Sequence, residues 1–313
     1  MELLKWNGEP LSRMMLGTVQ FGMPYGIANR SGQPEYSEVL SILKEAIDGG
    51  VNALDTAAAY GTSEEVLGRA LRELGVADRM FVVTKVRPLT PEELSNPEAA
   101  GRAIEESVHE SRRRLRLDRL PGVLFHREAD GAFVEALVEL RRRGFLEHAG
   151  VSCNNFPGPA EAFVRSGNVS ALQIPGNILD RRHQQSGIFR LAEDRGIGVY
   201  LRSVYLQGLL VMPEGEIPPH LSEIIPARRR LQSVADGAGL SLGELSLRYM
   251  LSQRGVTSIL TGVENVDQVR RNLAAFAAGP LGSDLVEAID SLALEVPEDV
   301  MTPSTWSNPS QTR

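Results

Sequence analysis

Four side chains of complementary chemistry stand close to apolar segments of the chain. They are Asp55, Tyr60, Lys85 and His126: a carboxylate, a phenol, an ammonium and an imidazole. Each of these residue types alone is commonplace at the end of a strand. Together, groups of these kinds can hold, donate and accept protons, which is the requirement for general acid and base catalysis. The set is therefore a candidate catalytic centre, provided that the fold brings the four residues together.

Short apolar segments alternate with longer helical segments along the chain. Between the short segments, apolar residues recur at the 3.6-residue spacing of a helix, for example at Val39, Leu40, Leu43 and Ile47. The short segments are nearly continuous apolar runs, which is typical of parallel strands with helices on one side and packed side chains on the other. Eight strands are predicted, at residues 14–18, 51–56, 80–85, 120–125, 148–152, 171–174, 198–202 and 257–261.

Eight such units, with no break in composition, predict an α/β fold consisting of one (β/α)₈ TIM barrel over residues 1–313. An Asn7-Gly8 pair between apolar residues indicates an N-terminal β-hairpin over residues 1–12, with the positive φ angles of a type I′ turn. This hairpin could close the bottom of the barrel. Residues 283–294 predict an extra C-terminal helix, and residues 295–313 a tail that either is disordered or folds over the barrel top.

The barrel supplies the reason for the four candidate residues to meet. In a barrel of this kind, the carboxyl ends of the strands and the loops after them line the active site. Asp55, Tyr60, Lys85 and His126 all stand at or just after the ends of three consecutive predicted strands. We therefore expect their side chains to converge on one end of the barrel.

The composition excludes several classes of protein and partner. With 42% hydrophobic and 23% charged residues, the chain can bury a sizeable core, unlike a disordered chain, collagen or a coiled coil. A net charge of −7 disfavours nucleic acid, and the runs Arg112-Arg113-Arg114, Arg141-Arg142-Arg143 and Arg228-Arg229-Arg230 are interpreted as solvated helix faces. The single cysteine, Cys153, excludes an intrachain disulfide, and no metal site is predicted. Without a signal peptide or a long apolar stretch, a cytoplasmic protein with no membrane span is expected.

The segment Asp55-Thr56-Ala57-Ala58-Ala59-Tyr60-Gly61-Thr62-Ser63-Glu64, followed by Gly68, resembles a motif of the aldo-keto reductase superfamily. The resemblance extends from Gly17-Thr18 to Asn272, which is essentially the whole chain. With Lys85 and His126, the motif resembles the catalytic tetrad of that family. The resemblance implies an oxidoreductase that acts on carbonyl or alcohol groups with a nicotinamide cofactor. The segments at residues 17–22 and 173–181 resemble those of a bacterial branch associated with carbohydrate metabolism.

Carbonyl chemistry explains why the tetrad needs these residue types. Reduction requires a hydride for the carbon and a proton for the oxygen, and a phenol with a pKa of about 10 is a weak acid near neutral pH. Tyr60 is the expected proton donor. An ammonium at Lys85 would lower the pKa of that phenol, and Asp55 would hold the ammonium charged and in place. His126 could donate a hydrogen bond to the carbonyl oxygen.

The family resemblance also implies where the cofactor binds. No Gly-x-Gly-x-x-Gly motif follows a strand, so a Rossmann site is not predicted, and the dinucleotide is expected to lie extended across the barrel top. Ser152 and Gln173 are expected at the nicotinamide carboxamide, with Asn154 as a third contact. The residues expected at the rest of the nicotinamide and at the pyrophosphate are Gly17, Thr18, Asp55, Arg202, Ser203, Leu206, Gln207 and Gly208.

The segment at residues 261–272 resembles the adenosine end of the family site. The residues expected there are Gly262, Val263, Glu264, Gln268 and Asn272. Family members that bind NADPH tightly often have Lys or Arg at the positions of Gly262 and Gln268, and neither is basic here. NADP(H) is thus the cofactor implied by the resemblance, with NAD(H) as the alternative. Arg270 or Arg271 could supply the missing positive charge.

At the position of Arg202, many members of the family have an aromatic residue stacked on the nicotinamide ring. A guanidinium can also stack, but its charge should disfavour the cationic, oxidised ring. Arg202 is therefore expected either to stack and favour the reduced cofactor or to bind an anionic group of the substrate. The structural alternative is an ion pair with a neighbouring acid.

The substrate side of the site is expected to include Gln20, Tyr25 and Trp306. Polar groups with flat surfaces suit a sugar or another small polar carbonyl compound. The leading hypothesis is an NAD(P)H-dependent reductase of such a compound. An NAD(P)⁺-dependent sugar dehydrogenase on the same site, or a non-catalytic nucleotide-binding regulatory subunit, are the alternatives. The sequence does not indicate an oligomeric state.

Overall fold

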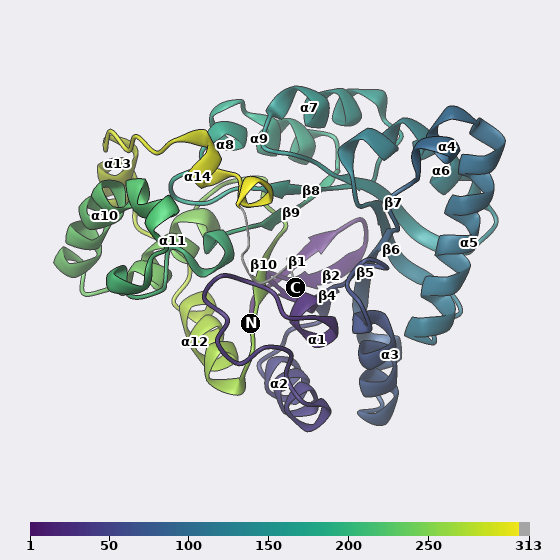
Figure 1. The fold of residues 1–313 in the computed structure, drawn as a ribbon, viewed down its shortest axis with the longest axis horizontal. Helices are drawn as coiled ribbons and strands as arrows, with labels where there is room; N and C mark the ends of the chain where they lie inside the picture. The colour runs from purple at the N-terminus through teal and green to yellow at the C-terminus, as the bar shows by residue number, and fades with distance from the viewer. Residues whose placement is uncertain (307–313) are drawn as a thin grey trace.

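Eight parallel strands close into a barrel in the computed structural model, which describes residues 1–306 (Figure 1). Each strand pairs with the next along the chain, and the last pairs with the first. The predicted TIM barrel is confirmed, with every strand boundary within two residues of its expected position. The strands are β3 (Met14–Gly17), β4 (Ala53–Asp55), β5 (Phe81–Val86), β6 (Leu120–Phe125), β7 (Leu146–Ser152), β8 (Ala171–Pro175), β9 (Gly198–Arg202) and β10 (Ser258–Gly262).

Helices surround the barrel and bury their apolar faces against it (Figure 1). In α2 (Tyr36–Asp48), for example, Val39, Ile42, Leu43 and Ala46 are buried, at the spacing of one helix face. The other helices around the barrel are α3 (Ser63–Glu73), α5 (Pro97–Leu115), α6 (Val134–Arg142), α7 (Pro157–Ser166), α9 (Ile188–Asp194), α10 (Ile225–Gly237), α11 (Leu242–Leu251) and α12 (Val266–Ala277). None of the helices within residues 1–306 has the length and apolar content needed to cross a bilayer.

Shorter helices and turns connect these elements. Short α-helices are α1 (Val19–Gly22), α4 (Pro91–Ser95), α8 (Arg182–Gln185), α13 (Ser283–Asp290) and α14 (Glu298–Met301). The 3₁₀ segments are η1 (Ala77–Arg79), η2 (Glu128–Phe133), η3 (Leu206–Gly208), η4 (Glu214–Glu216), η5 (Pro219–Ile224) and η6 (Pro303–Thr305). The expected extra helix at 283–294 corresponds to α13, which ends four residues earlier, at Asp290.

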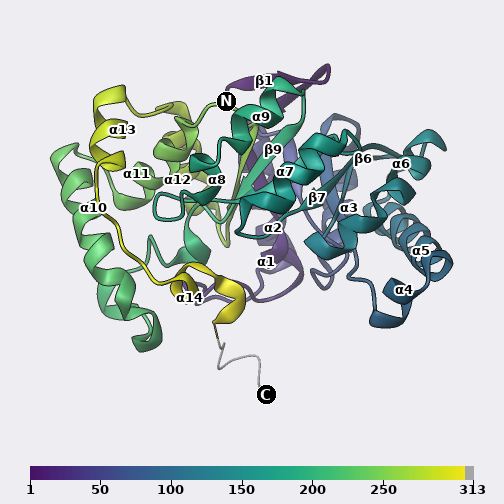
Figure 2. The same ribbon diagram turned by 90° about the horizontal axis from the view of Figure 1, so that it is seen from above.

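The N-terminal hairpin closes the amino-terminal end of the barrel, on the side away from α14 (Figure 2). Its strands are β1 (Leu3–Trp6) and β2 (Glu9–Ser12), and both turn residues, Asn7 and Gly8, have the positive φ angles of a type I′ turn. Trp6 packs into the barrel interior, with its ring centroid 6.0 Å from those of Phe81 and Tyr200. This end is therefore filled with side chains.

The described part of the C-terminal tail folds onto the rim of the barrel. Val300, in α14, is buried. Arg182, in α8, forms an ion pair with Glu298 at 3.3 Å. Residues 307–313 of the predicted tail lie outside the described residues. The described part of the tail thus contacts the segment that follows β8.

Candidate active site

A pocket of about 1400 Å³ opens at the carboxyl ends of the barrel strands. Its volume exceeds the roughly 300 to 1,000 Å³ of a typical small-ligand site, so it has room for a ligand longer than one small molecule. The expected convergence of the strand ends is visible in its lining. The strands or the loops after them contribute Gly17, Asp55, Tyr60, His126, Ser152, Gln173, Arg202 and Gly262.

A buried ion pair forms the base of this pocket. The Lys85 Nζ lies 2.6 Å from Asp55 Oδ1 and also donates to the carbonyl oxygen of Thr56 at 2.9 Å. Gln173 Nε2 donates a second hydrogen bond to Asp55 Oδ1, at 2.7 Å. The Lys85 side chain is only 1% exposed and the Asp55 side chain 4%. Burial lowers the pKa of Lys85, and the carboxylate of Asp55 opposes that shift.

Tyr60 and His126 lie directly in front of this pair. The Lys85 Nζ is 5.1 Å from the centroid of the Tyr60 ring. The His126 ring meets the Tyr60 ring edge to face, with centroids 5.5 Å apart. Nδ1 of His126 is buried without a hydrogen-bond partner among the described residues. The structure thus brings all four candidate catalytic residues together, with Lys85 behind the pocket wall and Tyr60, His126 and Asp55 on it.

The protonation states differ in one respect from the expectation. Burial raises the pKa of Tyr60, Asp55 adds to the increase, and Arg202 opposes it. The expected lowering of the Tyr60 pKa by Lys85 is therefore not observed, and the cation that opposes the increase is Arg202. Burial, followed by the charges of Lys85 and Arg202, lowers the pKa of His126 to about 3. Near neutral pH the phenol is protonated and the imidazole is uncharged, and both can donate a proton or hydrogen bond to a ligand.

Close backbone packing fixes the loop that carries Tyr60. A Cβ added at Gly22 would lie 1.9 Å from the Tyr60 carbonyl oxygen, so only glycine allows the two loops to approach this closely. Ser63 Oγ donates to the Thr18 carbonyl oxygen at 2.7 Å, and Thr18 Oγ1 donates to the Asp55 carbonyl oxygen at 2.9 Å. Thr18, which was expected at the cofactor, is therefore buried within this support rather than on the pocket surface.

The predicted cofactor and substrate residues divide into two groups. Those that line the pocket, besides the catalytic candidates, are Gly17, Gln20, Tyr25, Ser152, Gln173, Arg202, Ser203, Gln207, Gly208, Gly262, Glu264, Gln268 and Asn272. Leu206 and Val263 are buried in the core, and their side chains do not reach the pocket. Asn154 is exposed, and its backbone N–H and side-chain amide both contact Glu128. Trp306 donates to the Asp299 carbonyl oxygen at 2.9 Å and does not line the pocket.

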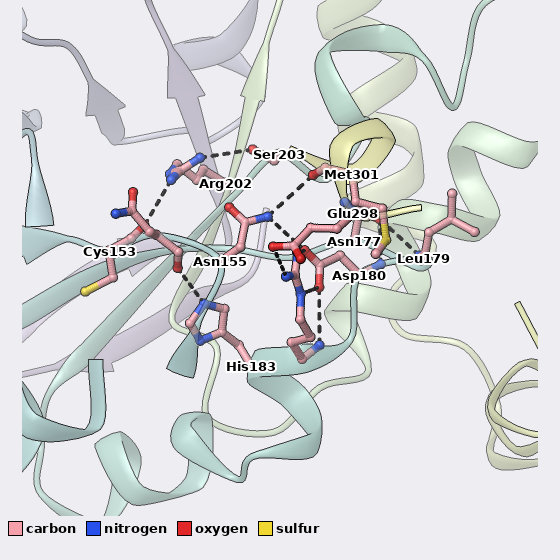
Figure 3. Close-up of polar contacts among 12 residues, drawn as sticks. Cys153, Asn155, Asn177, Leu179, Asp180, His183, Arg202, Ser203, Glu298 and Met301 are labelled. Carbon is pink, nitrogen blue, oxygen red and sulfur yellow. Dashed lines mark hydrogen bonds and ion pairs between the residues drawn. The ribbon is translucent and has the colours of Figure 1, made fainter. Parts of the chain in front are cut away.

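The rim beside Asn154 is occupied by a polar network rather than by open space (Figure 3). His183 Nε2 lies 2.8 Å from the Asn154 carbonyl oxygen. Asn155 Nδ2 donates to Asp180 Oδ2 at 3.1 Å and to the Met301 carbonyl oxygen at 3.4 Å. This network attaches α14 to the loops after β7 and β8.

Two contacts bridge the mouth of the pocket. Gln207 Nε2 donates to Tyr25 Oη at 3.1 Å, and Arg30 forms an exposed ion pair with Glu216 at 3.0 Å. They join the loop after α1 to the loop after β9, and Tyr25, Gln207 and Glu216 all line the pocket.

At the other end of the pocket, the chain forms the expected helix N-terminus. Asn265 caps α12, and its side chain accepts a hydrogen bond from the Gln268 backbone N–H at 3.0 Å. Gln268 Oε1 in turn accepts from the Glu264 backbone N–H at 2.7 Å. Arg271 lines the pocket, whereas Arg270 is exposed and forms an ion pair with Glu45 at 3.0 Å. Of the two arginines that could supply positive charge, the structure therefore brings only Arg271 to the pocket.

The pocket also includes residues that the sequence analysis did not assign to it. Arg228 was interpreted as solvated, but it is buried, and its Nη2 donates to the Met212 carbonyl oxygen at 2.7 Å. Arg228 lies three residues before Leu231, on the buried face of α10. This i, i+3 spacing is the sequence signal that could have indicated its burial. Further residues on this side are Tyr205, Val211, Met212, Glu214, Arg229, Gln232 and Gly243.

Comparisons with a family model and with curated relatives point to one family of oxidoreductases, and comparison with solved structures points to the same fold. The Aldo/keto reductase family matches residues 13–294. The uncharacterized oxidoreductase YqkF of Bacillus subtilis (strain 168) is 29% identical over 288 residues, which cover 85% of this chain and 91% of the relative. The NADH-specific methylglyoxal reductase of Escherichia coli (strain K12) is 27% identical over 321 residues, with coverages of 92% and 95%. The holo form of aldo-keto reductase AKR11C1 from Bacillus halodurans matches the fold with a TM-score of 0.77 and 23% identity, over 96% of this chain and 99% of that one.

Proposed function

The chain belongs to the aldo/keto reductase family, and from this premise we propose that it is an NAD(P)H-dependent reductase of small polar carbonyl compounds. The observation that carries the proposal is the meeting of Tyr60 and His126 in front of the buried Lys85–Asp55 pair, on the wall of a large pocket. A sugar or a comparable polar aldehyde or ketone is the proposed substrate.

The residues present fit a nicotinamide dinucleotide. The pocket is long enough to run from Tyr60 to Asn272, and Gln20 Oε1 is a buried acceptor without a partner in the described chain. Ser152 and Gln173 are proposed to hold the carboxamide end, the backbone around Ser203 and Gly208 the pyrophosphate, and Gln268 with Asn272 the adenosine end. When bound, this cofactor supplies the hydride that no side chain can provide.

The protein's own contribution is the handling of the proton and the carbonyl oxygen. Tyr60 is proposed to donate its phenolic proton to that oxygen, because burial keeps the phenol protonated near neutral pH. The uncharged imidazole of His126 is proposed to donate a hydrogen bond to the same oxygen and to orient the substrate. Lys85, held by Asp55, stabilises the tyrosinate that remains.

The proposal is tested by following nicotinamide absorbance with NADPH and then NADH, in the presence of an activated aromatic aldehyde and a panel of aldoses. We expect oxidation of the cofactor that depends on the carbonyl compound and saturates with its concentration. Tight cofactor binding with no turnover of any carbonyl compound would contradict the reductase and would favour a nucleotide-binding regulatory role.

Arg271 should decide the choice between NADPH and NADH. As the arginine that lines the pocket near Asn272, it is proposed to contact the 2′-phosphate. We expect Arg271→Gln to raise the Kd for NADPH about tenfold or more, in line with the loss of a charge-assisted hydrogen bond, and to leave the Kd for NADH within about twofold. Fluorescence titration of the bound nicotinamide measures both constants. The matched control is Arg270→Gln, since Arg270 pairs with Glu45 outside the pocket. Equal losses for NADPH and NADH would refute the contact.

A further inference from the structure

Arg202 lies at the point where three strands end in the pocket. It is the last residue of β9, and its Nη2 donates to the carbonyl oxygen of Cys153, just after β7, at 2.9 Å. Its Nη1 donates to Ser203 Oγ at 3.3 Å (Figure 3). These two contacts hold the guanidinium across the strand ends, on the wall that also carries Tyr60 and His126.

The positive charge of Arg202 is not balanced by a carboxylate. The neighbouring cations are paired: Lys85 with Asp55 at 2.6 Å and Arg182 with Asp180 at 2.8 Å. Within residues 1–306, no acidic oxygen lies within ion-pair distance of Arg202, so the structural alternative of an ion pair with a neighbouring acid is not observed. Nε of Arg202 is buried and has no hydrogen-bond partner in the same residues. Such an N–H costs free energy until a ligand or water satisfies it.

The guanidinium retains the capacity to bind an anion. It has five N–H donors, and the two observed contacts use two of them. A guanidinium stays charged over the whole working pH range, and its planar donors match a carboxylate or phosphate. Arg202 lines the same pocket as Tyr60 and His126, so one small molecule in that pocket can contact the guanidinium and the proton donor together. The charge of Arg202 opposes the increase in the pKa of Tyr60 and adds to the decrease in the pKa of His126.

We propose that Arg202 binds an anionic group of the substrate, so that the enzyme prefers carbonyl compounds that carry a carboxylate or a phosphate over their neutral counterparts. This inference rests on the proposed reductase function. The carbonyl oxygen lies at Tyr60 and His126, and the anionic group lies against the unpaired face of the guanidinium. A neutral sugar would leave the charge of Arg202 uncompensated.

The inference is tested with matched pairs of probes: 4-formylbenzoate with its methyl ester, and glyceraldehyde 3-phosphate with glyceraldehyde. In the wild-type protein we expect kcat/KM for each anionic probe to exceed that for its neutral partner by about tenfold or more. Arg202→Gln should lower kcat/KM at least about tenfold more for the anionic probes than for the neutral ones, as expected for loss of one partner of a charged contact. A loss shared by both kinds of probe would report the effect of the Arg202 charge on Tyr60 and His126. Arg202→Lys, which keeps the charge but not the planar donors, should give an intermediate loss.

A binding measurement separates this inference from the proposed function. Titration calorimetry of 4-(hydroxymethyl)benzoate into the NADPH-loaded protein reports affinity without turnover. We expect Arg202→Gln to weaken that binding about tenfold or more and to leave the binding of neutral 1,4-benzenedimethanol unchanged. If the wild-type protein reduces no carbonyl compound, the proposed function fails and the titration alone decides the anion site.

Two results would overturn the anion site. One is equal loss of kcat/KM for charged and neutral probes in Arg202→Gln, accompanied by a changed ratio of the affinities for NADPH and NADP⁺. That pattern would assign Arg202 to the nicotinamide ring. The other is a wild-type protein that binds 4-(hydroxymethyl)benzoate and 1,4-benzenedimethanol with the same affinity.

Discussion

Tyr60→Phe should lower kcat for carbonyl reduction by a factor of about 10² to 10⁴, the range attributed to a positioned general acid. The substitution removes only the phenolic O–H, so the ring still packs edge to face against His126. The Kd for NADPH should stay within about threefold of the wild-type value. Steady-state rates with an aldehyde probe and fluorescence titration of NADPH measure the two effects separately.

The matched control for this variant is Tyr25→Phe. Tyr25 also lines the pocket, but its hydroxyl accepts a hydrogen bond from Gln207. Loss of the Tyr25 hydroxyl should change KM more than kcat. Turnover in Tyr60→Phe within tenfold of the wild-type rate would exclude Tyr60 as the proton donor. His126 or an ordered water would then be the candidate donor.

Lys85→Met should reduce the free energy of unfolding by about 3 to 5 kcal/mol, because it leaves the carboxylate of Asp55 buried without its cation. Only the hydrogen bond from Gln173 would then remain on Asp55 Oδ1. Urea unfolding followed by circular dichroism measures the loss. The variant should also be inactive, but its stability is the sharper readout because it does not depend on the substrate.

Two controls show whether the loss comes from an uncompensated buried charge. The double variant Asp55→Asn/Lys85→Met has no charge at either position, and we expect it to regain most of the lost stability. Lys44→Met breaks a comparable contact with Asp48, but on the surface, so its unfolding midpoint should match that of the wild type. A single variant Lys85→Met as stable as the wild type would mean that water reaches the Asp55 carboxylate.

The sequence was most informative where a repeated pattern carried the information. Alternating apolar runs and helical stripes predicted all eight barrel strands, and Asn7-Gly8 predicted the hairpin, because both depend on local backbone preferences. The meeting of Asp55, Tyr60, Lys85 and His126 followed from the geometry of a parallel barrel. Their chemical roles remain predictions.

Other features of the site depend on how side chains pack, which the sequence pattern does not encode. Thr18 has the polarity of a ligand contact, but its hydroxyl is used to support the Tyr60 loop. Arg228 belongs to a charged run, and yet its position in the helix turns it inward. The pKa of Tyr60 rises chiefly because the side chain is buried, and the extent of burial is a tertiary property.

The pairing of β3 with β10 has a consequence for how the protein is made. Met14 pairs with Ile259, and Ser258 Oγ donates to the Ser12 carbonyl oxygen at 2.7 Å. The first barrel strand therefore completes its hydrogen bonding only when the last strand is present. During synthesis, β3 emerges early, but one of its edges stays open until nearly the whole chain has left the ribosome. All four of its residues are buried in the finished barrel. A ribosome that stalls before residue 258 would therefore display an unpaired apolar edge, and such edges are prone to aggregation.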